Sequence, residues 1–119
     1  VVGIFLDKYR KKQSLEIHGS GEQRRDFIHV SDVVQANIKA METTHVGEIL
    51  NVGSGINYSV NELAAFFPLE KNHTASRAGD ANTTLADVKK ITELLDWTPQ
   101  ITLEEGIKSM IQAIDEELN

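Results

Sequence analysis

The chain has 119 residues, the length of a single domain, with 40% apolar residues, 25% charged residues and a formal net charge of −6. These values are typical of a globular fold, and no apolar run approaches the ~20 residues that span a bilayer. The negative charge argues against a nucleic-acid partner, and the absence of cysteine excludes disulfides and cysteine metal ligands and fits a cytoplasmic protein.

Residues 1–12 predict a helix, because Val1, Phe5 and Tyr9 recur at the spacing of one helical face. A short strand is expected at 15–19, where apolar and polar residues alternate. A turn rich in glycine follows, so the chain is expected to begin with a helix, a strand and a tight turn.

A second strand is expected at 26–30, and Ser31 is the expected N-cap of a helix over 32–44. Three apolar residues align along this helix: Val34, Ile38 and Met41. The apolar segment 48–52 predicts a third strand, and its composition suggests that the strand is buried.

Ser59 and Glu62 form the S-x-x-E pattern of a capping box, which predicts a helix over 60–67. Pro68 ends this helix, because proline cannot continue the hydrogen-bonding pattern. The following stretch, 69–84, is polar and is expected to be mostly irregular, with room for one short strand.

Asp87 is the expected cap of a helix over 88–97, and Thr102 with Glu105 forms a second capping box that opens the last helix. The last helix carries one continuous apolar stripe: Leu103, Ile107, Met110, Ile111, Ile114 and Leu118. Core packing is the favoured interpretation of this stripe, and a partner-binding face is the alternative.

The fold class expected from these elements is α+β, as a small irregular domain over 1–119 with four or five helices and about three short strands. The strands are too few and too short for a full parallel sheet. Because the sequence starts at Val1, in the middle of a predicted helix and without methionine, we expect it to be a fragment of a longer chain.

Two turns, 19–24 and 53–58, begin like the G-x-G-x-x-G cofactor loop but lack its third glycine. Tight turns that need positive φ angles are the favoured interpretation. No metal site is expected, because the four histidines are scattered without metal-ligand spacing: His18, His29, His45 and His73.

Arginine is scarce in this sequence, and it is the side chain best suited to bind phosphate. Arg25 follows one glycine turn and Arg77 precedes another, so a cleft between them suits a small phosphorylated ligand, with Asp80 accepting hydrogen bonds from hydroxyls. The alternative is structural ion pairing. In that case Arg25 pairs with Asp26 or Asp32. Arg77 then pairs with Asp80.

Three blocks occur in a recognisable order: "LEIHGSGEQRRDFIHVSDVVQA", "GEILNVGSGINYSVNELA" and "RAGDANTTLADVKKITELLDWTPQITLEEGI". Together they resemble the C-terminal region of the extended short-chain dehydrogenase/reductase family. The resemblance is to the nucleotide-sugar epimerases and dehydratases of that family, with UDP-glucose 4-epimerase as the type member. It covers nearly all of the 119 residues.

The resemblance implies roles for particular residues. Arg25, before the D-F pair, matches an arginine that contacts the nucleotide diphosphate, and Arg77 of the R-x-G-D motif matches a second one. Asp80 matches the aspartate that receives the ribose hydroxyls. His18 matches a residue that lies against the nucleobase, and Val60 matches a position near the base.

The same resemblance implies that Asp26, Asp32 and Asp87 are structural, and that the parent enzyme binds NAD in an N-terminal Rossmann domain. That domain's glycine loop and Tyr-x-x-x-Lys pair are absent here, so this chain is expected to bind no cofactor and to be inactive alone. It is expected to bind a nucleotide-sugar, most simply a UDP-sugar, and to form a homo-oligomer. A stand-alone nucleotide-binding or regulatory module and a structural interaction protein are the alternatives.

Overall fold

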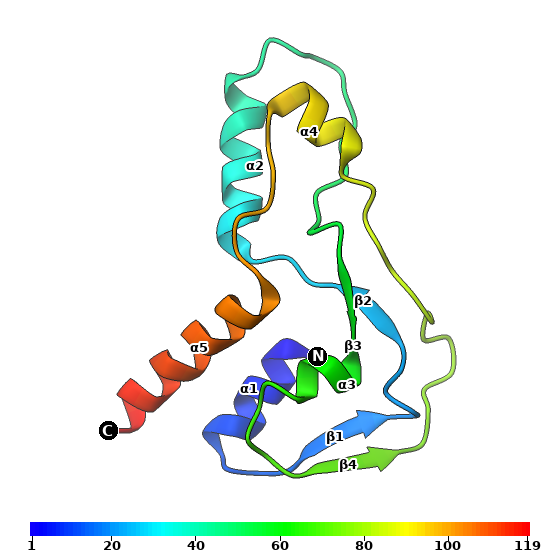
Figure 1. Ribbon diagram of the computed structural model, residues 1–119, viewed down its shortest axis with the longest axis vertical. Coiled ribbons are helices and arrows are strands. Elements are labelled where there is room, and N and C mark those ends of the chain that lie inside the picture. Colours follow the sequence, from blue (N-terminus) through cyan, green and yellow to red (C-terminus); the bar gives the residue numbers. More distant parts are fainter.

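Five helices and four short strands make up the computed structural model, which describes residues 1–119 (Figure 1). In chain order they are α1 (Val2–Arg10), β1 (Leu15–His18), β2 (Arg24–Asp26), α2 (Val30–Glu42), β3 (Asn57–Ser59), α3 (Val60–Ala64), β4 (Lys71–Thr74), α4 (Lys89–Leu95) and α5 (Leu103–Leu118). The expected α+β class is confirmed, with one strand more than the three that the sequence predicted. Two of the four, β3 and β4, were not among the three predicted strands, although the polar stretch left room for β4.

The strands form two separate sheets of two strands each. β1 and β4 run parallel, with Leu15 beside Lys71 and His18 beside Thr74. β2 and β3 run antiparallel, and Arg25 lies opposite Tyr58 in that ladder. Because β4 ends beside the end of β1, the segment after Thr74 begins next to His18.

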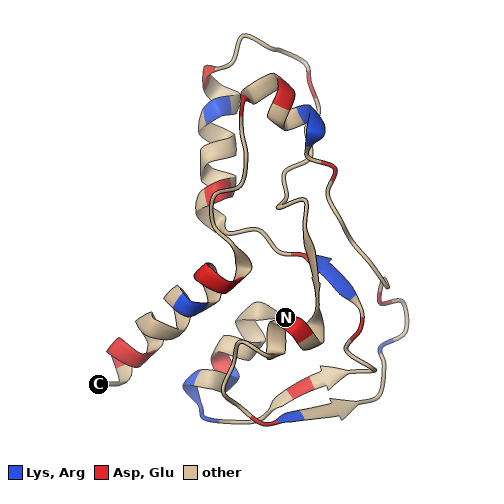
Figure 2. Cartoon of the chain, viewed as in Figure 1, with Lys and Arg blue, Asp and Glu red and all other residues tan.

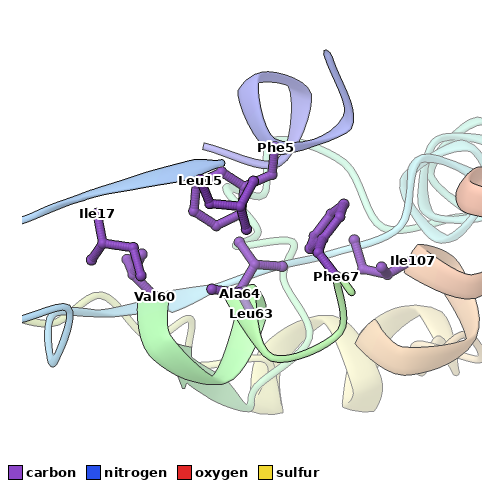
Figure 3. Packing of buried hydrophobic residues seen from close by; sticks show 8 residues of the cluster. All are labelled: Phe5, Leu15, Ile17, Val60, Leu63, Ala64, Phe67 and Ile107. Carbon is purple, nitrogen blue, oxygen red and sulfur yellow. The ribbon is translucent and has the colours of Figure 1, made fainter. Parts of the chain in front are cut away.

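The larger hydrophobic core joins α1, β1, α3 and α5 (Figure 3). Its eight buried members are Phe5, Leu15, Ile17, Val60, Leu63, Ala64, Phe67 and Ile107. The rings of Phe5 and Phe67 meet edge to face, with centroids 5.7 Å apart and an interplanar angle of 84°. This edge-to-face arrangement is the one that aromatic quadrupoles favour, and it fixes α1 against the end of α3.

A smaller core lies at the other end of the molecule, between α2 and α4 (Figure 1). Ala36, Ile91, Leu95 and Trp97 are its buried members. The indole Nε1 of Trp97 donates a hydrogen bond of 3.0 Å to the backbone oxygen of Asp32. The Asp32 carboxylate in turn accepts from the backbone nitrogens of Gln100 and Ile101, at 3.0 and 3.1 Å. These bonds tie the connection to α5 to the start of α2.

The two cores leave a flat and open molecule, with principal extents of 49 × 39 × 17 Å. Its radius of gyration is 16.6 Å, whereas a compact domain of this length has about 13.5 Å. Only 18 of the 119 residues are buried, so much of the apolar surface faces outward. No helix has both the length and the apolar character needed to cross a membrane.

The predicted strand at 26–30 is wrong in position, because β2 ends at Asp26. β3 offers partners to β2 only from Arg24 to Asp26, and backbone pairing decides where a strand ends. The predicted N-cap Ser31 is also wrong. α2 begins at Val30, and the N-cap is His29, whose Nδ1 accepts from the backbone nitrogen of Ser31 at 3.2 Å.

The predicted buried strand at 48–52 does not form. Neither the nitrogens nor the carbonyls of this segment make a backbone hydrogen bond, and the Ile49 side chain is 87% exposed. Leu50 packs on the smaller core, and the Ile49 carbonyl accepts only from Nζ of Lys90, at 3.1 Å. A strand needs a neighbour to satisfy its backbone groups, and this chain places none beside the segment.

Both capping boxes are confirmed at the starts of α3 and α5. α3 is shorter than expected and stops at Ala64, and α4 stops at Leu95 because Asp96 takes a left-handed conformation with a φ of 49°. Asp87 accepts a hydrogen bond from Lys89 at 3.0 Å, but the N-cap position belongs to Val88.

The apolar face of α2 is exposed rather than buried. Met41 is 86% exposed, and three further residues of this face also face solvent: Val30, Val34 and Ile38. The stripe on α5 is mixed, because Ile107 and Ile114 are buried whereas Leu118 is exposed. Core packing therefore holds for part of the α5 stripe, and the unpartnered apolar face is the one on α2.

Candidate functional site

A cavity of about 670 Å³ lies between the start of α1, the strands β1 and β2, and the turn at 77–80. All five residues that the resemblance implied line this one cavity: His18, Arg25, Val60, Arg77 and Asp80. They come from positions up to 62 residues apart in sequence. The tertiary structure therefore brings the full predicted set together at one cavity. The turns seen in the sequence do not by themselves fix that arrangement.

Strand β2 carries two adjacent arginines, in the blue part of this strand in Figure 2. The alternation of a strand directs their side chains to opposite sides. Arg24 is occupied by the protein, since its Nε donates to Oδ1 of Asn57 at 2.9 Å and its Nη2 lies 3.3 Å from a carboxylate oxygen of Glu62. Arg25 faces the cavity, and its Nη1 donates to the backbone oxygen of Arg24 at 2.8 Å. Of the two, only Arg25 lines this cavity.

The turn at 77–80 is anchored at both ends and open in the middle. Before it, β4 ends at Thr74 in the ladder with β1. After it, the backbone oxygen of Asn82 accepts from the nitrogen of Arg24 at 2.8 Å. Gly79 has a φ of 78°, and a side chain added there would meet no atom within 4 Å. The turn is therefore held against β1 and β2 while its tip stands in open space.

Arg25 and Asp80 form an ion pair across the cavity, between Nη2 and Oδ1. The side chains are 24% and 40% exposed, so the pair is only partly shielded from water. The structural pairs that the sequence offered as an alternative are wrong. Asp26 and Asp32 accept hydrogen bonds elsewhere, and Arg77 makes no ion pair.

The carboxylate of Asp26 ties three segments together beside the cavity. It accepts from the nitrogen and the Oγ of Ser54 at 2.8 and 2.6 Å, from the nitrogen of Gly55 at 3.0 Å and from that of Ala86 at 3.1 Å. Burial raises the pKa of Asp26, but these hydrogen bonds outweigh it, so the net pKa lies below the ordinary value. The expected structural role of Asp26 is confirmed.

Close packing explains the first glycine of the turn at 53–58. A Cβ on Gly53 would lie 2.4 Å from the Cβ of Ala86 and 2.9 Å from Oδ2 of Asp26. Gly55 has a φ of 72°, which confirms the expected positive φ there. The nitrogens of Ser54 and Gly55 donate to Asp26, so these two amides are not free to bind a cofactor pyrophosphate.

The other end of the cavity is formed by His18, Val60 and Gln23. Nδ1 of His18 lies 3.0 Å from Oγ1 of Thr74, and the Gln23 side chain donates to the His18 backbone oxygen at 3.0 Å. Val60 belongs to the larger core and closes the floor. Sequence reasoning missed Gln23, although its position two residues before Arg25 is the spacing that places both on one side of an extended chain.

A second cavity of about 340 Å³, lined by no hydrophobic residue, adjoins the first. Four residues line both cavities: His18, Gln23, Arg77 and Asp80. Arg77 therefore stands between two solvent-filled hollows with an exposed and unpaired guanidinium. Such a group is free to bind an anion from either side.

Comparison with known proteins gives the same result at three levels. Residues 5–110 match the protein family described as GDP-mannose 4,6 dehydratase. The chain is 33% identical over 118 residues to a UDP-glucose 4-epimerase of Mycolicibacterium smegmatis, covering 94% of this chain and 38% of that protein. Its fold is similar to the crystal structure of UDP-glucose 4-epimerase from Thermotoga maritima with UDP-glucose, with a TM-score of 0.90 and 33% identity over 99% of this chain and 40% of that one.

A further solved structure, MoeE5 in complex with UDP-glucuronic acid and NAD, has a TM-score of 0.88 and 30% identity, covering 98% of this chain and 41% of that chain. The fold and these matches define the C-terminal part of an extended short-chain dehydrogenase/reductase of the epimerase and dehydratase type. The chain belongs to the GDP-mannose 4,6 dehydratase family. The resemblance recognised in the sequence is thereby confirmed, and the chain spans about 40% of the length of these relatives.

Proposed function

We propose that this chain is the substrate-binding portion of an NAD-dependent nucleotide-sugar epimerase or dehydratase, similar to the UDP-sugar 4-epimerases. In this proposal residues 1–119 form one nucleotide-sugar binding domain. The single observation that carries it is the cavity of about 670 Å³, which Arg25, Arg77 and Asp80 line together. That volume lies within the usual range of sites for small ligands.

The charges around the cavity suit a nucleoside diphosphate. A diphosphate removed from water needs paired charge and hydrogen bonds, and Arg25 and Arg77 supply two guanidinium groups in a chain that is otherwise acidic. The carboxylate of Asp80 supplies acceptors for the two ribose hydroxyls. His18 and Val60 provide a flat ring and an apolar floor for the base.

The residues of this chain do not fit NAD, since the Ser54 and Gly55 amides of the glycine turn donate to Asp26. We therefore assign NAD binding and the hydride chemistry that NAD supplies to an N-terminal Rossmann portion outside these 119 residues. The present residues bind and orient the nucleotide. Without that portion the chain is proposed to be inactive.

The segment 48–52 and the apolar face of α2 form the surface to which we assign that Rossmann portion. The segment 48–52 makes no backbone–backbone hydrogen bond and the side chain of Ile49 is exposed, as in a strand that lacks its sheet. On α2 the exposed apolar residues include Val34 and Met41. Adding this segment to a sheet edge would satisfy the backbone and cover both apolar patches.

An apolar surface of this kind predicts that the isolated chain self-associates. We expect light scattering at high concentration to report a dimer or larger species, through Ile49 and the α2 face. Ile49→Lys should shift the population toward monomer, and Leu118→Lys, at an exposed apolar residue on the far end of α5, should not. A clean monomer at all concentrations would contradict this prediction.

The test of the binding proposal is a calorimetric titration of the 119-residue chain with UDP. Arg77→Ala is expected to weaken UDP binding by about 10- to 150-fold, since hydrogen bonds to a charged group contribute about 1.5–3 kcal/mol. Arg77 makes no ion pair with the rest of the chain, so its removal should leave the melting temperature unchanged.

Arg10→Ala is the matched control, because Arg10 is an exposed arginine that pairs with Glu117 at 2.8 Å, outside the cavity. This control should leave UDP affinity unaltered, and NAD should produce no heat with any variant. The proposed site would be rejected if UDP gave no binding heat at millimolar concentration, or if Arg77→Ala and the parent chain bound UDP with equal affinity. Stable self-association without UDP binding would favour an interaction module instead.

A further inference from the structure

The ion pair between Arg25 and Asp80 joins the two groups that the proposed function assigns to different parts of one ligand. We propose that this pair selects the ligand: it disfavours bare anions and admits molecules that carry both a phosphate group and a neighbouring pair of hydroxyls. The inference rests on the proposed function. It adds a specificity role for Asp80 that acts through Arg25.

The guanidinium of Arg25 is satisfied by other groups of the protein. Nη2 is bound to Asp80 and Nη1 donates to the backbone oxygen of Arg24. A phosphate that binds Arg25 bidentately must therefore displace the Asp80 carboxylate. Arg77 has no such competitor, because its guanidinium makes no ion pair.

The displaced carboxylate decides which ligands bind well. With inorganic pyrophosphate, the negative charge of Asp80 loses its partner and remains beside a second negative charge, which disfavours the complex. With a nucleoside diphosphate, two ribose hydroxyls donate to the same carboxylate and replace the guanidinium. Both members of the broken ion pair then have new partners, because Arg25 binds phosphate oxygens and Asp80 accepts from the ribose hydroxyls.

The turn that carries Asp80 is able to make this exchange. Gly79 has a positive φ of 78° and no neighbour within 4 Å of its Cβ position, so the tip of the turn is not packed against other segments. The pair is partly exposed, at 24% and 40% for the two side chains, so breaking it is not prohibitive. Arg77 thus attracts any anion, and the Arg25–Asp80 pair distinguishes among the anions.

The experiment compares three ligands on the 119-residue chain by calorimetry: inorganic pyrophosphate, UDP and 2′,3′-dideoxy-UDP. Asp80→Asn removes the competing charge, so pyrophosphate should bind roughly two- to fivefold more tightly, the range for a partly exposed ion pair. UDP should bind about tenfold more weakly, because its hydroxyls lose a charged acceptor. UDP and its dideoxy analogue should then bind Asp80→Asn nearly equally, whereas the parent chain prefers UDP.

Glu16→Gln is the matched control, since Glu16 lines the same cavity and its removal changes the net charge equally. Its one ion pair is with Lys8, at 4.0 Å, and it does not contact Arg25. This variant should shift pyrophosphate and UDP affinity by the same small factor. If only the net charge mattered, Asp80→Asn and Glu16→Gln would change the affinities alike. Selection by the ion pair predicts that they differ.

Opposite shifts for pyrophosphate and UDP in Asp80→Asn support the selection, because loss of structure would weaken both ligands together. Parallel shifts, or an unchanged pyrophosphate affinity while the parent chain binds UDP, would overturn the inference and leave the proposed function standing. If the parent chain binds neither UDP nor pyrophosphate, the proposed function fails, and this inference fails with it.

Discussion

Trp97→Ala is expected to lower the free energy of unfolding by about 4 kcal/mol, within the range for large aromatic residues in cores. Trp97 is 1% exposed and is the largest member of the smaller core, between α2 and α4. Its replacement opens a cavity and removes the 3.0 Å hydrogen bond from Nε1 to the backbone oxygen of Asp32. Urea unfolding, followed by circular dichroism, measures the change.

Trp97→Phe separates the two contributions, because phenylalanine keeps an aromatic ring but cannot donate to Asp32. We expect a loss of about 1–2 kcal/mol from the missing hydrogen bond and the smaller ring. Hydrogen exchange should show the larger loss of protection in α2 and α4, since the other core contains none of these residues. A uniform loss across both cores, or no change in Trp97→Ala, would contradict this account.

Asp26→Ala is expected to destabilise the fold by about 3 kcal/mol at neutral pH, because four donors lose a charged acceptor. These donors lie on Ser54, Gly55 and Ala86, in the segments that cross between the two cores (Figure 1). The same change should weaken UDP binding, since Asp26 directly follows Arg25 at the cavity. Chemical unfolding and calorimetry measure the two effects.

The contribution of Asp26 depends on pH in a defined direction. The hydrogen bonds hold the folded-state pKa of Asp26 below its unfolded value of 3.8. The stabilisation is therefore fully present above that unfolded value and is lost as the pH falls through the lower, folded value. The difference in unfolding free energy between the parent chain and Asp26→Asn should be constant near neutral pH and should narrow in strong acid.

Asp87→Asn is the control for this pH dependence, because the Asp87 carboxylate accepts a single hydrogen bond, at 3.0 Å from Lys89, at the exposed start of α4. Its effect should be much smaller at every pH. A gap between Asp26→Asn and the parent chain that widens in acid would have the wrong sign. That result would mean that the carboxylate is stabilised in its protonated form.

Local features of the sequence were enough to place most helices. The capping boxes at Ser59 and Thr102 form within one turn of the chain, so they can be recognised from the sequence without any tertiary contact. The start of α2 was misplaced because the His29 ring takes the capping role that Ser31 has in the usual pattern. The ends of β2 depended on its partner β3, which lies some thirty residues away.

The segment 48–52 shows the limit of composition as a guide. Its apolar residues predicted a buried strand, and the sequence pattern contains no information on whether a neighbouring strand is present. In this chain Ile49 is exposed and the segment makes no backbone–backbone hydrogen bond. A strand is a property of two segments, so its absence here follows from what surrounds the segment rather than from its own residues.

The sequence by itself determined the fold class and the family and predicted the five residues of the proposed site, because three distinctive blocks and local helix signals carry that information. Only the tertiary structure decided that these five residues share one cavity and that Arg25 pairs with Asp80, fifty-five positions away. It also decided that Arg24 binds Asn57 outside that cavity, whereas its neighbour Arg25 lines it. The physical reason is distance: caps and turns depend on adjacent residues, whereas ion pairs and cavities depend on segments that meet only after the chain has folded.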